Sequence, residues 1–422
     1  MKFLFCLCVL LSSANLLASP CGGAAGSVWT NPDTSVGGFV ASTAFAEATV
    51  IIEAGSEICE NAQVYGTAQI KGASIITGNA FIANTAIVEN SVVEENAQVY
   101  NTANVSGGAT IKGSARVQGN AIIQGTSTVH GNGPLIDDQA RVNSSASVLG
   151  SAKVYGQAFI SAAGSVQGTA EVYDTAVITG QVLENARVYN NASVRNGAIV
   201  KGSASAYGKT IITDNAEVSG NAKVYGDTLI GWGTRISGNA EVYDHALIKL
   251  DPAMPWTGIT GDTKVFGRAR IFGLSTVQNA AMVFDDVQIF DGRIFGNAQV
   301  SENAVINNAQ ISENAIIKGT AQVLAGSVYQ NAQVYGNAII RNGTPYIYGN
   351  SQIFESAVIE GGAIITDYAQ IYGSAFINGG QVAQSGQVYG SATVESTGVV
   401  LEFARVFGTA VVSTQISWDV SE

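Results

Sequence analysis

The sequence is poor in charged residues and has no basic region. Asp, Glu, Lys and Arg make up only 12% of its 422 residues, and the formal net charge at pH 7 is −12. The negative charge is spread along the chain, so the protein would be repelled by nucleic-acid phosphates and by anionic lipid. After residue 18 no stretch is long and apolar enough to cross a membrane. We therefore expect neither nucleic-acid binding nor a membrane span.

Cysteine is also scarce, and the first residues of the chain indicate export. Residues 1–18 have a charged start, an apolar stretch and a small-residue cleavage site, the pattern of a bacterial secretory signal. Pro20 disfavours lipidation of the cysteine that follows it. Cleavage leaves Cys21 and Cys59, which we expect to form a disulfide in an oxidising compartment. This bridge would tie residues 19–38 onto the first coils as an N-terminal cap.

A six-residue repeat fills the rest of the chain. The motif NAQVYG at 61–66 returns as NAEVYD, NARVYN and NAKVYG, and an aliphatic residue recurs every six positions from about Ile52 to Ile416. So short a period is typical of a solenoid, in which each coil packs only on its neighbours. The abundant Gly, Ala, Asn, Val and Ile suit short strands and tight turns and argue against helices. We predict one long all-β domain at 39–416, with a tail at 417–422.

Each repeat reads as a small residue, any residue, an aliphatic residue, any residue and two turn residues. Because alternate side chains of a strand point to opposite faces, Ala62 and Val64 should point inward and Gln63 and Tyr65 outward. Gly, Asn and Asp at the corners tolerate positive φ. This pattern resembles the hexapeptide-repeat, left-handed parallel β-helix family of bacterial proteins, which implies a triangular coil with three sides. About 20 coils spaced by about 4.8 Å would make a rod of about 95 Å.

The family that the chain resembles includes acyltransferases and carbonic anhydrases, and the residues of this chain argue against both activities. The carbonic anhydrases hold zinc with three histidines, whereas this chain has only His130 and His245, on different sides. The acyltransferases use a histidine as general base near a subunit cleft, but His245 lies in a tight corner. Corner acids such as Asp174 and Asp285 match no calcium-loop spacing. We therefore predict a non-enzymatic protein without a catalytic residue, metal site or cofactor.

The spacing of the inward aliphatic residues assigns three sides, which we name A, B and C in chain order. Seven steps between these residues are five residues long instead of six. They begin at Val88, Ile178, Leu183, Ile289, Ile306, Val323 and Ile377. Six of them fall at the corner from side B to side C, if residues 249–258 are an insertion there. The spacing therefore predicts that length variation belongs mainly to one corner.

Side A has an aromatic residue directly after its inward aliphatic residue in most coils. The central members of this ladder are Tyr155, Tyr173, Tyr189, Tyr207, Tyr225 and Tyr243. One interpretation is that stacked rings stabilise neighbouring coils, as cross-strand aromatic pairs do in any sheet. The other is a ligand-binding strip, in which the rings and nearby polar residues such as Lys153 and Glu171 contact a glycan or a cell surface.

Side B has an apolar residue just before its inward aliphatic residue in most coils. Central members of this apolar row are Val177, Ile211, Leu229 and Leu247. A long exposed apolar row usually marks an interface, and homotrimers are common in the family that the chain resembles, so we predict a homo-oligomer. The alternative is that β-branched residues simply suit strands.

The insertion at 249–258 is the main local irregularity. It contains two prolines, which prevent regular strand pairing. Trp256 lies within it, and Trp232 occupies the same corner one coil earlier. The two tryptophans would contribute to an apolar knob or groove, which is either a lid over a packing defect or a second ligand-binding site.

These patterns predict an exported, rigid protein of the bacterial cell envelope, located in the periplasm, on the outer surface or outside the cell. An adhesin-like protein that contacts polysaccharide through side A is the first hypothesis. A purely structural spacer is the second, and an acyltransferase the third.

Overall fold

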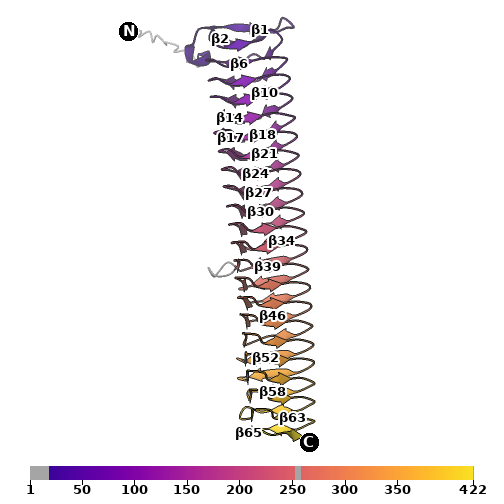
Figure 1. Cartoon of the computed structure of the whole chain (residues 1–422). Coiled ribbons are helices and arrows are strands. Elements are labelled where there is room, and N and C mark those ends of the chain that lie inside the picture. The colour runs from indigo at the N-terminus through magenta and orange to yellow at the C-terminus, as the bar shows by residue number, and fades with distance from the viewer. Residues whose placement is uncertain (1–18, 252–257, 422) are drawn as a thin grey trace, which may run out of the picture.

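The chain forms one long rod. The computed structural model describes residues 19–251 and 258–421, and Figure 1 shows the first coils at one end of the rod and the C terminus at the other. The backbone winds into a parallel β-solenoid of about 21 turns. The only helix in the described part is a short 3₁₀ turn, η1 (Pro20–Gly23). The predicted all-β solenoid is thus confirmed, while its left-handed sense stays a prediction.

Each turn contributes one short strand to each of three parallel sheets, and these sheets are the predicted sides. Side A runs from β3 (Phe45–Ala46) to β66 (Val420–Ser421), side B from β4 (Ile51–Ile52) to β64 (Val411–Val412), and side C from β2 (Val36–Ala41) to β65 (Gln415–Ile416). Each strand pairs in parallel with the strand three further along the chain. On side A, β36 (Glu241–Val242) pairs with β39 (Lys264–Val265) so that Val242 lies opposite Val265.

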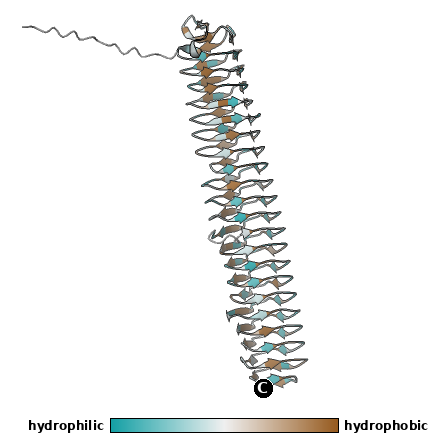
Figure 2. Cartoon of the chain, turned by 90° about the vertical axis from the view of Figure 1, so that its left-hand side faces the viewer, coloured by the Kyte–Doolittle hydropathy of each residue, from teal (hydrophilic) through white to brown (hydrophobic). Residues whose placement is uncertain are grey.

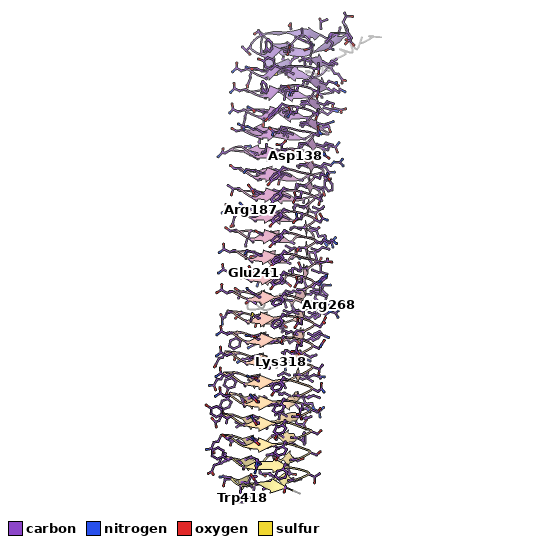
Figure 3. All side chains as sticks on the ribbon, turned by 45° about the vertical axis from the view of Figure 1, so that its right-hand side comes forward. Asp138, Arg187, Glu241, Arg268, Lys318 and Trp418 are labelled. Carbon is purple, nitrogen blue, oxygen red and sulfur yellow. A yellow bond between two sulfur atoms is a disulfide. The ribbon has the colours of Figure 1, made fainter. Side chains whose placement is uncertain are left out.

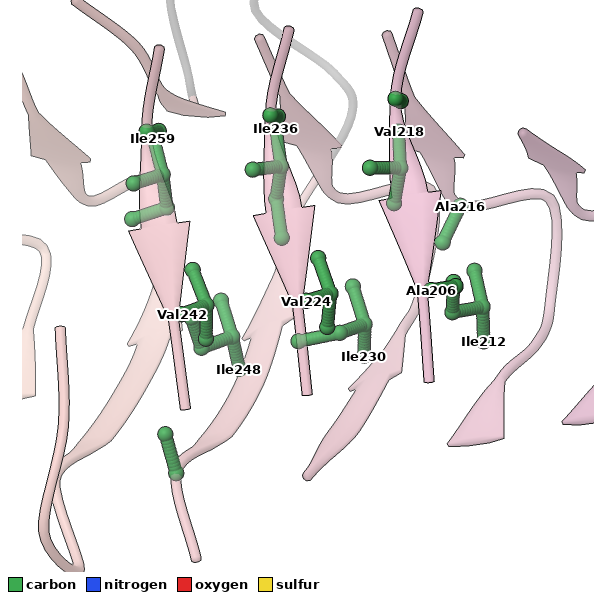
Figure 4. Packing of buried hydrophobic residues seen from close by; sticks show 14 of the residues in the cluster. Ala206, Ile212, Ala216, Val218, Val224, Ile230, Ile236, Val242, Ile248 and Ile259 are labelled. Carbon is green, nitrogen blue, oxygen red and sulfur yellow. The ribbon is translucent and has the colours of Figure 1, made fainter. Parts of the chain in front are cut away.

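The core is a narrow column of aliphatic and small side chains. Ala62 and Val64 are fully buried, whereas Gln63 is exposed and Tyr65 half-buried, as the alternation predicts. Figure 4 shows how aliphatic residues recur in the core from coil to coil. The labelled residues include Val218, Ile236 and Ile259 of side C, Val224 and Val242 of side A, and Ile212, Ile230 and Ile248 of side B. Since every coil buries a similar set, stability is a sum of similar contributions along the rod.

The corners differ in how constant their length is. From the inward residue of side A to that of side B the spacing is six residues in every described coil. Outside the 249–258 insertion, the spacing from side B to side C varies from four residues, between Ile178 and Val182, to seven, between Ile340 and Ile347. The predicted 249–258 insertion lies at this corner too. Its first two residues, Lys249 and Leu250, extend β37 (Leu247–Leu250), and its last, Gly258, begins β38 (Gly258–Ile259). Length variation is therefore concentrated at the B-to-C corner, as predicted.

One inward residue assigned from the spacing is wrong. The spacing predicts that Leu183 points inward, but β26 (Gln181–Val182) buries Val182 and leaves Leu183 half-buried. The short turn depends on Gly180, because a Cβ there would lie 2.4 Å from the Ala198 carbonyl oxygen. Two supposed five-residue steps are therefore one four-residue step and one regular step. The apparent exception to the rule that short steps lie at the B-to-C corner disappears.

A hairpin closes the N-terminal end of the rod. β1 (Gly26–Thr30) pairs antiparallel with β2. The buried Asn31 side chain accepts a hydrogen bond from the Ile52 N–H at 2.8 Å and donates one to the Ile52 carbonyl at 3.1 Å. The Trp29 Nε1–H donates to the Val50 carbonyl at 3.2 Å. These contacts satisfy backbone groups that the first coil would otherwise leave open to pairing with another chain.

The C-terminal segment extends the solenoid further than predicted. β66 lies within the predicted tail and adds a last strand to side A by pairing with β63 (Arg405–Phe407). The Arg405 guanidinium binds the Asp419 carboxylate at 2.6 Å and anchors this strand.

Candidate functional site

The predicted aromatic ladder forms along the corner from side A to side B. Eight rings in consecutive coils stack: Tyr155, Tyr173, Tyr189, Tyr207, Tyr225, Tyr243, Phe266 and Phe284. Neighbouring centroids are 4.8 to 5.0 Å apart and neighbouring planes differ by 1 to 7°. A second ladder of five rings runs from Tyr335 to Phe407. The structure therefore brings together all six tyrosines named from the sequence.

Constant corner length keeps these rings in register. The residue after each ring has positive φ, as at Asp174, Asn190, Gly208 and Gly226, and Gly, Asn and Asp adopt this conformation at the least cost. Because the corner has the same length and the same turn in each coil, every ring lies directly over the previous one.

Stacking covers the ring faces inside the ladder. An interior ring has a nearly parallel ring on each side, so both of its faces are covered. All six tyrosines are half-buried. Burial raises the pKa of all six phenols, to about 12 for Tyr173 and Tyr225. In the second ladder, Lys318 (labelled in Figure 3) places its Nζ 5.5 Å from the Tyr335 ring centroid and covers the first ring. A sugar ring, which needs an open aromatic face, cannot stack on the interior of either ladder.

The charged residues beside the first ladder pair with one another. Glu171 lies between Lys153 and Arg187, with Nζ–Oε1 and Nε–Oε2 distances of 3.1 and 3.4 Å. Lys223 and Glu241 form the same contact at 3.1 Å. Exposed pairs of this kind contribute about 0–1 kcal/mol each. They link adjacent coils and leave no strip of a single charge beside the tyrosines.

The corner acids have a role that the sequence did not suggest. Asp174 Oδ2 accepts a hydrogen bond from the Asn190 backbone N–H at 3.1 Å, and Asp285 Oδ2 accepts one from the Glu302 N–H at 3.1 Å. The same contact from one coil to the next recurs along the rod, with Glu, Asp or Gln as the acceptor. These side chains satisfy backbone donors at the turns, so their abundance needs no bound ion to explain it.

The predicted disulfide is present. Cys21 and Cys59 are bonded, with their Cα atoms 5.3 Å apart, and the Cys21 N–H donates to Glu57 Oε2 at 2.7 Å. These three residues form the one cluster of potential metal ligands in the described part of the chain. The two sulfur atoms are bonded to each other, so neither is a thiolate that could bind a metal.

The apolar row of side B is only partly exposed. Ile211, Leu229 and Leu247 are half-buried and lie opposite one another on successive strands, while Val177 is 37% exposed. Ser193 interrupts the row between Val177 and Ile211. Figure 2 shows hydrophobic residues recurring along the rod with hydrophilic ones among them. Self-association through this row stays a prediction.

Trp232 lies beside a hollow in the middle of the rod. Its side chain is 57% exposed, and the Lys249 Nζ is 5.5 Å from the ring centroid. The hollow has a volume of about 660 Å³, and Glu217, Trp232 and Arg235 are among the residues that line it. Trp232 has a φ of 59°, a conformation that is rare for a bulky residue. Trp256 lies outside the described residues.

The two histidines do not form a site. His130 and His245 are both exposed and lie at different corners, many coils apart.

No helix in the described ranges is long and apolar enough to cross a membrane. No family model matches the chain, and no curated protein matches it significantly. The likeness to hexapeptide-repeat proteins therefore rests on the residues of the repeat.

Proposed function

We propose that the protein is an exported, rigid spacer of the bacterial cell envelope, without catalytic activity. The observation that carries the proposal is the ladder, whose rings use their faces to contact adjacent coils. The side A ion pairs and the corner acids also find their partners in adjacent coils. Groups paired along the rod axis resist bending between coils and leave few sites for a ligand.

Two features support export. The disulfide between Cys21 and Cys59 is of a kind that persists in oxidising compartments and is rare in the cytosol. The secretory signal predicted at 1–18 agrees with this, although it lies outside the described residues. Both features agree with a position in the periplasm, on the outer surface or outside a bacterial cell.

The ladder supports a spacer better than the other two hypotheses. Polysaccharide binding through its interior would need open ring faces, which stacking removes. An acyltransferase would need a histidine in a cleft, whereas His245 is exposed at a corner.

Deleting whole coils tests the spacer proposal. Removal of residues 189–242 joins Val188 to Tyr243 in the same register and takes out three coils, so electron microscopy should show a folded rod that is about 14 Å shorter. In the producing cells, a spacer predicts an envelope defect that grows with the number of coils removed.

A matched variant keeps the length but changes the ladder's outer edge. Replacing Tyr173, Tyr189, Tyr207 and Tyr225 with Phe retains the stacking and removes four hydroxyls, so these cells should resemble the wild type. A defect in the phenylalanine variant together with a silent coil deletion would contradict the proposal. Protease treatment of intact cells would establish on which side of the outer boundary the mature protein lies.

A further inference from the structure

One surface column of the rod is polar in almost every coil. It lies at the corner from side C to side A, three residues after each inward aliphatic residue of side C, and up to residue 350 it contains only Asn, Ser, Thr, Asp and Ala. Where several asparagines follow one another, their side chains hydrogen-bond from coil to coil. Asn297, Asn314, Asn331 and Asn350 are linked in this way, with Nδ2–Oδ1 distances of 3.0 to 3.1 Å.

Tyr368 and Phe403 break this polar column near the C-terminal end. Their side chains are 65% and 81% exposed. Ser385 occupies the column in the coil between them, and Trp418, which is 62% exposed, lies at the same corner in the last turn (Figure 3). We call Tyr368, Phe403 and Trp418 the open row. Within residues 19–251 and 258–421 none of these rings stacks on another ring.

The open row has no evident role in stabilising the fold. Asn or Ser occupies the same column in most other coils, where the chain makes the same turn. The turn therefore does not require Tyr368 or Phe403. Aromatic side chains that are 62% to 81% exposed leave most of their apolar surface in water. Grouped at one corner, such residues usually mark a binding surface.

The geometry of the open row fits an extended chain with a regular repeat. Two coils separate Tyr368 from Phe403, which places them about 9.6 Å apart along the rod, a distance comparable to a disaccharide unit of an extended polysaccharide. Polar groups lie between the rings. Gln384 Oε1 accepts a hydrogen bond from the Glu402 N–H at 2.5 Å, while the exposed Glu402 carboxylate has no intramolecular hydrogen bond in the described part of the chain.

We propose that the open row binds a neutral polysaccharide. Sugar rings would stack on the open faces of Tyr368 and Phe403, and sugar hydroxyls would donate hydrogen bonds to the Glu402 carboxylate and the Ser385 hydroxyl. Glu402 and the net charge of −12 disfavour anionic polymers and anionic membranes. Isolated rings separated by polar residues also differ from the packed apolar centre of a protein interface. The proposal does not depend on the spacer function, because a rod of any role can carry this row.

Co-sedimentation with insoluble polysaccharides tests the proposal. The mature protein would be incubated with cellulose, chitin and a (1,3)-β-glucan, and with an anionic polygalacturonate gel. Wild type should bind at least one neutral polymer, and the double variant Tyr368→Asn/Phe403→Asn should bind it at least about tenfold more weakly. Since Asn is the usual residue of this column, the melting temperature should stay unchanged. The ladder variant with four phenylalanines should bind like wild type.

Several results would overturn the proposal. These are absence of wild-type binding to all three neutral polymers, preference for the anionic gel, equal binding by the double variant, or a lower melting temperature in that variant. Binding to envelope fragments of the producing cells that survives enzymatic removal of polysaccharide, and is lost in the double variant, would identify a protein partner instead. A rod that shortens correctly on coil deletion but binds no polysaccharide would refute this inference and leave the spacer proposal standing.

Discussion

The aromatic ladder and the open row use the same kind of residue in opposite ways. In the ladder, Tyr173 to Tyr243 stack at 4.8 to 4.9 Å and are half-buried. In the open row, Tyr368 and Phe403 are 65% and 81% exposed. The difference lies in what occupies the equivalent position one coil away. A solenoid repeats each position in every coil, so an aromatic residue with aromatic neighbours stabilises the stack, while an isolated one stays on the surface.

The aromatic ladder requires an A-to-B corner of constant length, whereas the B-to-C corner tolerates several lengths. A glycine inserted between Asn190 and Asn191 would give the A-to-B corner seven residues, a length that it has in no described coil. A glycine inserted between Asn196 and Gly197 gives the B-to-C corner of the same coil seven residues, as already found from Ile340 to Ile347. The first insertion should cost about 3 kcal/mol or more, because it shifts a register and breaks the stack. The second should cost under about 1 kcal/mol.

Urea unfolding of the two insertion variants, followed by tyrosine absorbance, checks this difference. Equal destabilisation by the two insertions would mean that the ladder does not require a constant A-to-B corner length.

Reducing the disulfide tests whether a change at one end of the rod stays confined to the neighbouring coils. Cys21 and Cys59 are 38 residues apart in sequence, and a loop of this size is expected to contribute about 3–4 kcal/mol through the unfolded state. Because each coil contacts only its neighbours, reduction should loosen the N-terminal hairpin and leave both aromatic regions unchanged. Hydrogen exchange measured with and without reductant distinguishes this result from loss of protection along the whole rod.

Alkaline pH acts on the ladder through its phenols. Burial raises the pKa of Tyr173 and Tyr225 to about 12, above the value of about 10 expected in the unfolded chain. Between these values the unfolded chain loses phenol protons more readily than the folded one, so stability should be full below pH 10 and fall as pH rises toward 12. The urea midpoint of the wild type should decline over this range, and that of the ladder variant with four phenylalanines should decline less. Parallel curves for the two proteins would contradict the burial of these phenols.

The period of the repeat was sufficient to predict the solenoid, its three sides and the ladder. Each of these features depends on the spacing of residues such as Val64 and Tyr65, which can be read directly from the sequence. Spacing could not choose between Val182 and Leu183, because both are aliphatic and Gly180 determines how tightly the chain turns. The disulfide was predictable because only Cys21 and Cys59 lie outside the predicted secretory signal.

Other features needed the three-dimensional register. Asp174 binds the backbone of Asn190 across 16 residues of sequence, and this pairing becomes visible only once coils of unequal length are aligned. The open row could not be predicted from the sequence for the same reason. Tyr368 and Phe403 are inconspicuous as single aromatic residues, and stand out only against the polar column that they interrupt.

Two matched substitutions test whether ladder aromatics stabilise the rod while open-row aromatics do not. The measurement is urea unfolding of residues 19–422 with either Tyr207→Ser or Phe403→Ser. Tyr207 stacks on two rings at 4.8 Å, so its loss should cost about 1–3 kcal/mol. Phe403→Ser introduces the residue found one coil earlier in its column and should change stability by less than about 0.5 kcal/mol. Equal shifts, or a larger shift for Phe403→Ser, would mean that stacking in the ladder does not stabilise the rod.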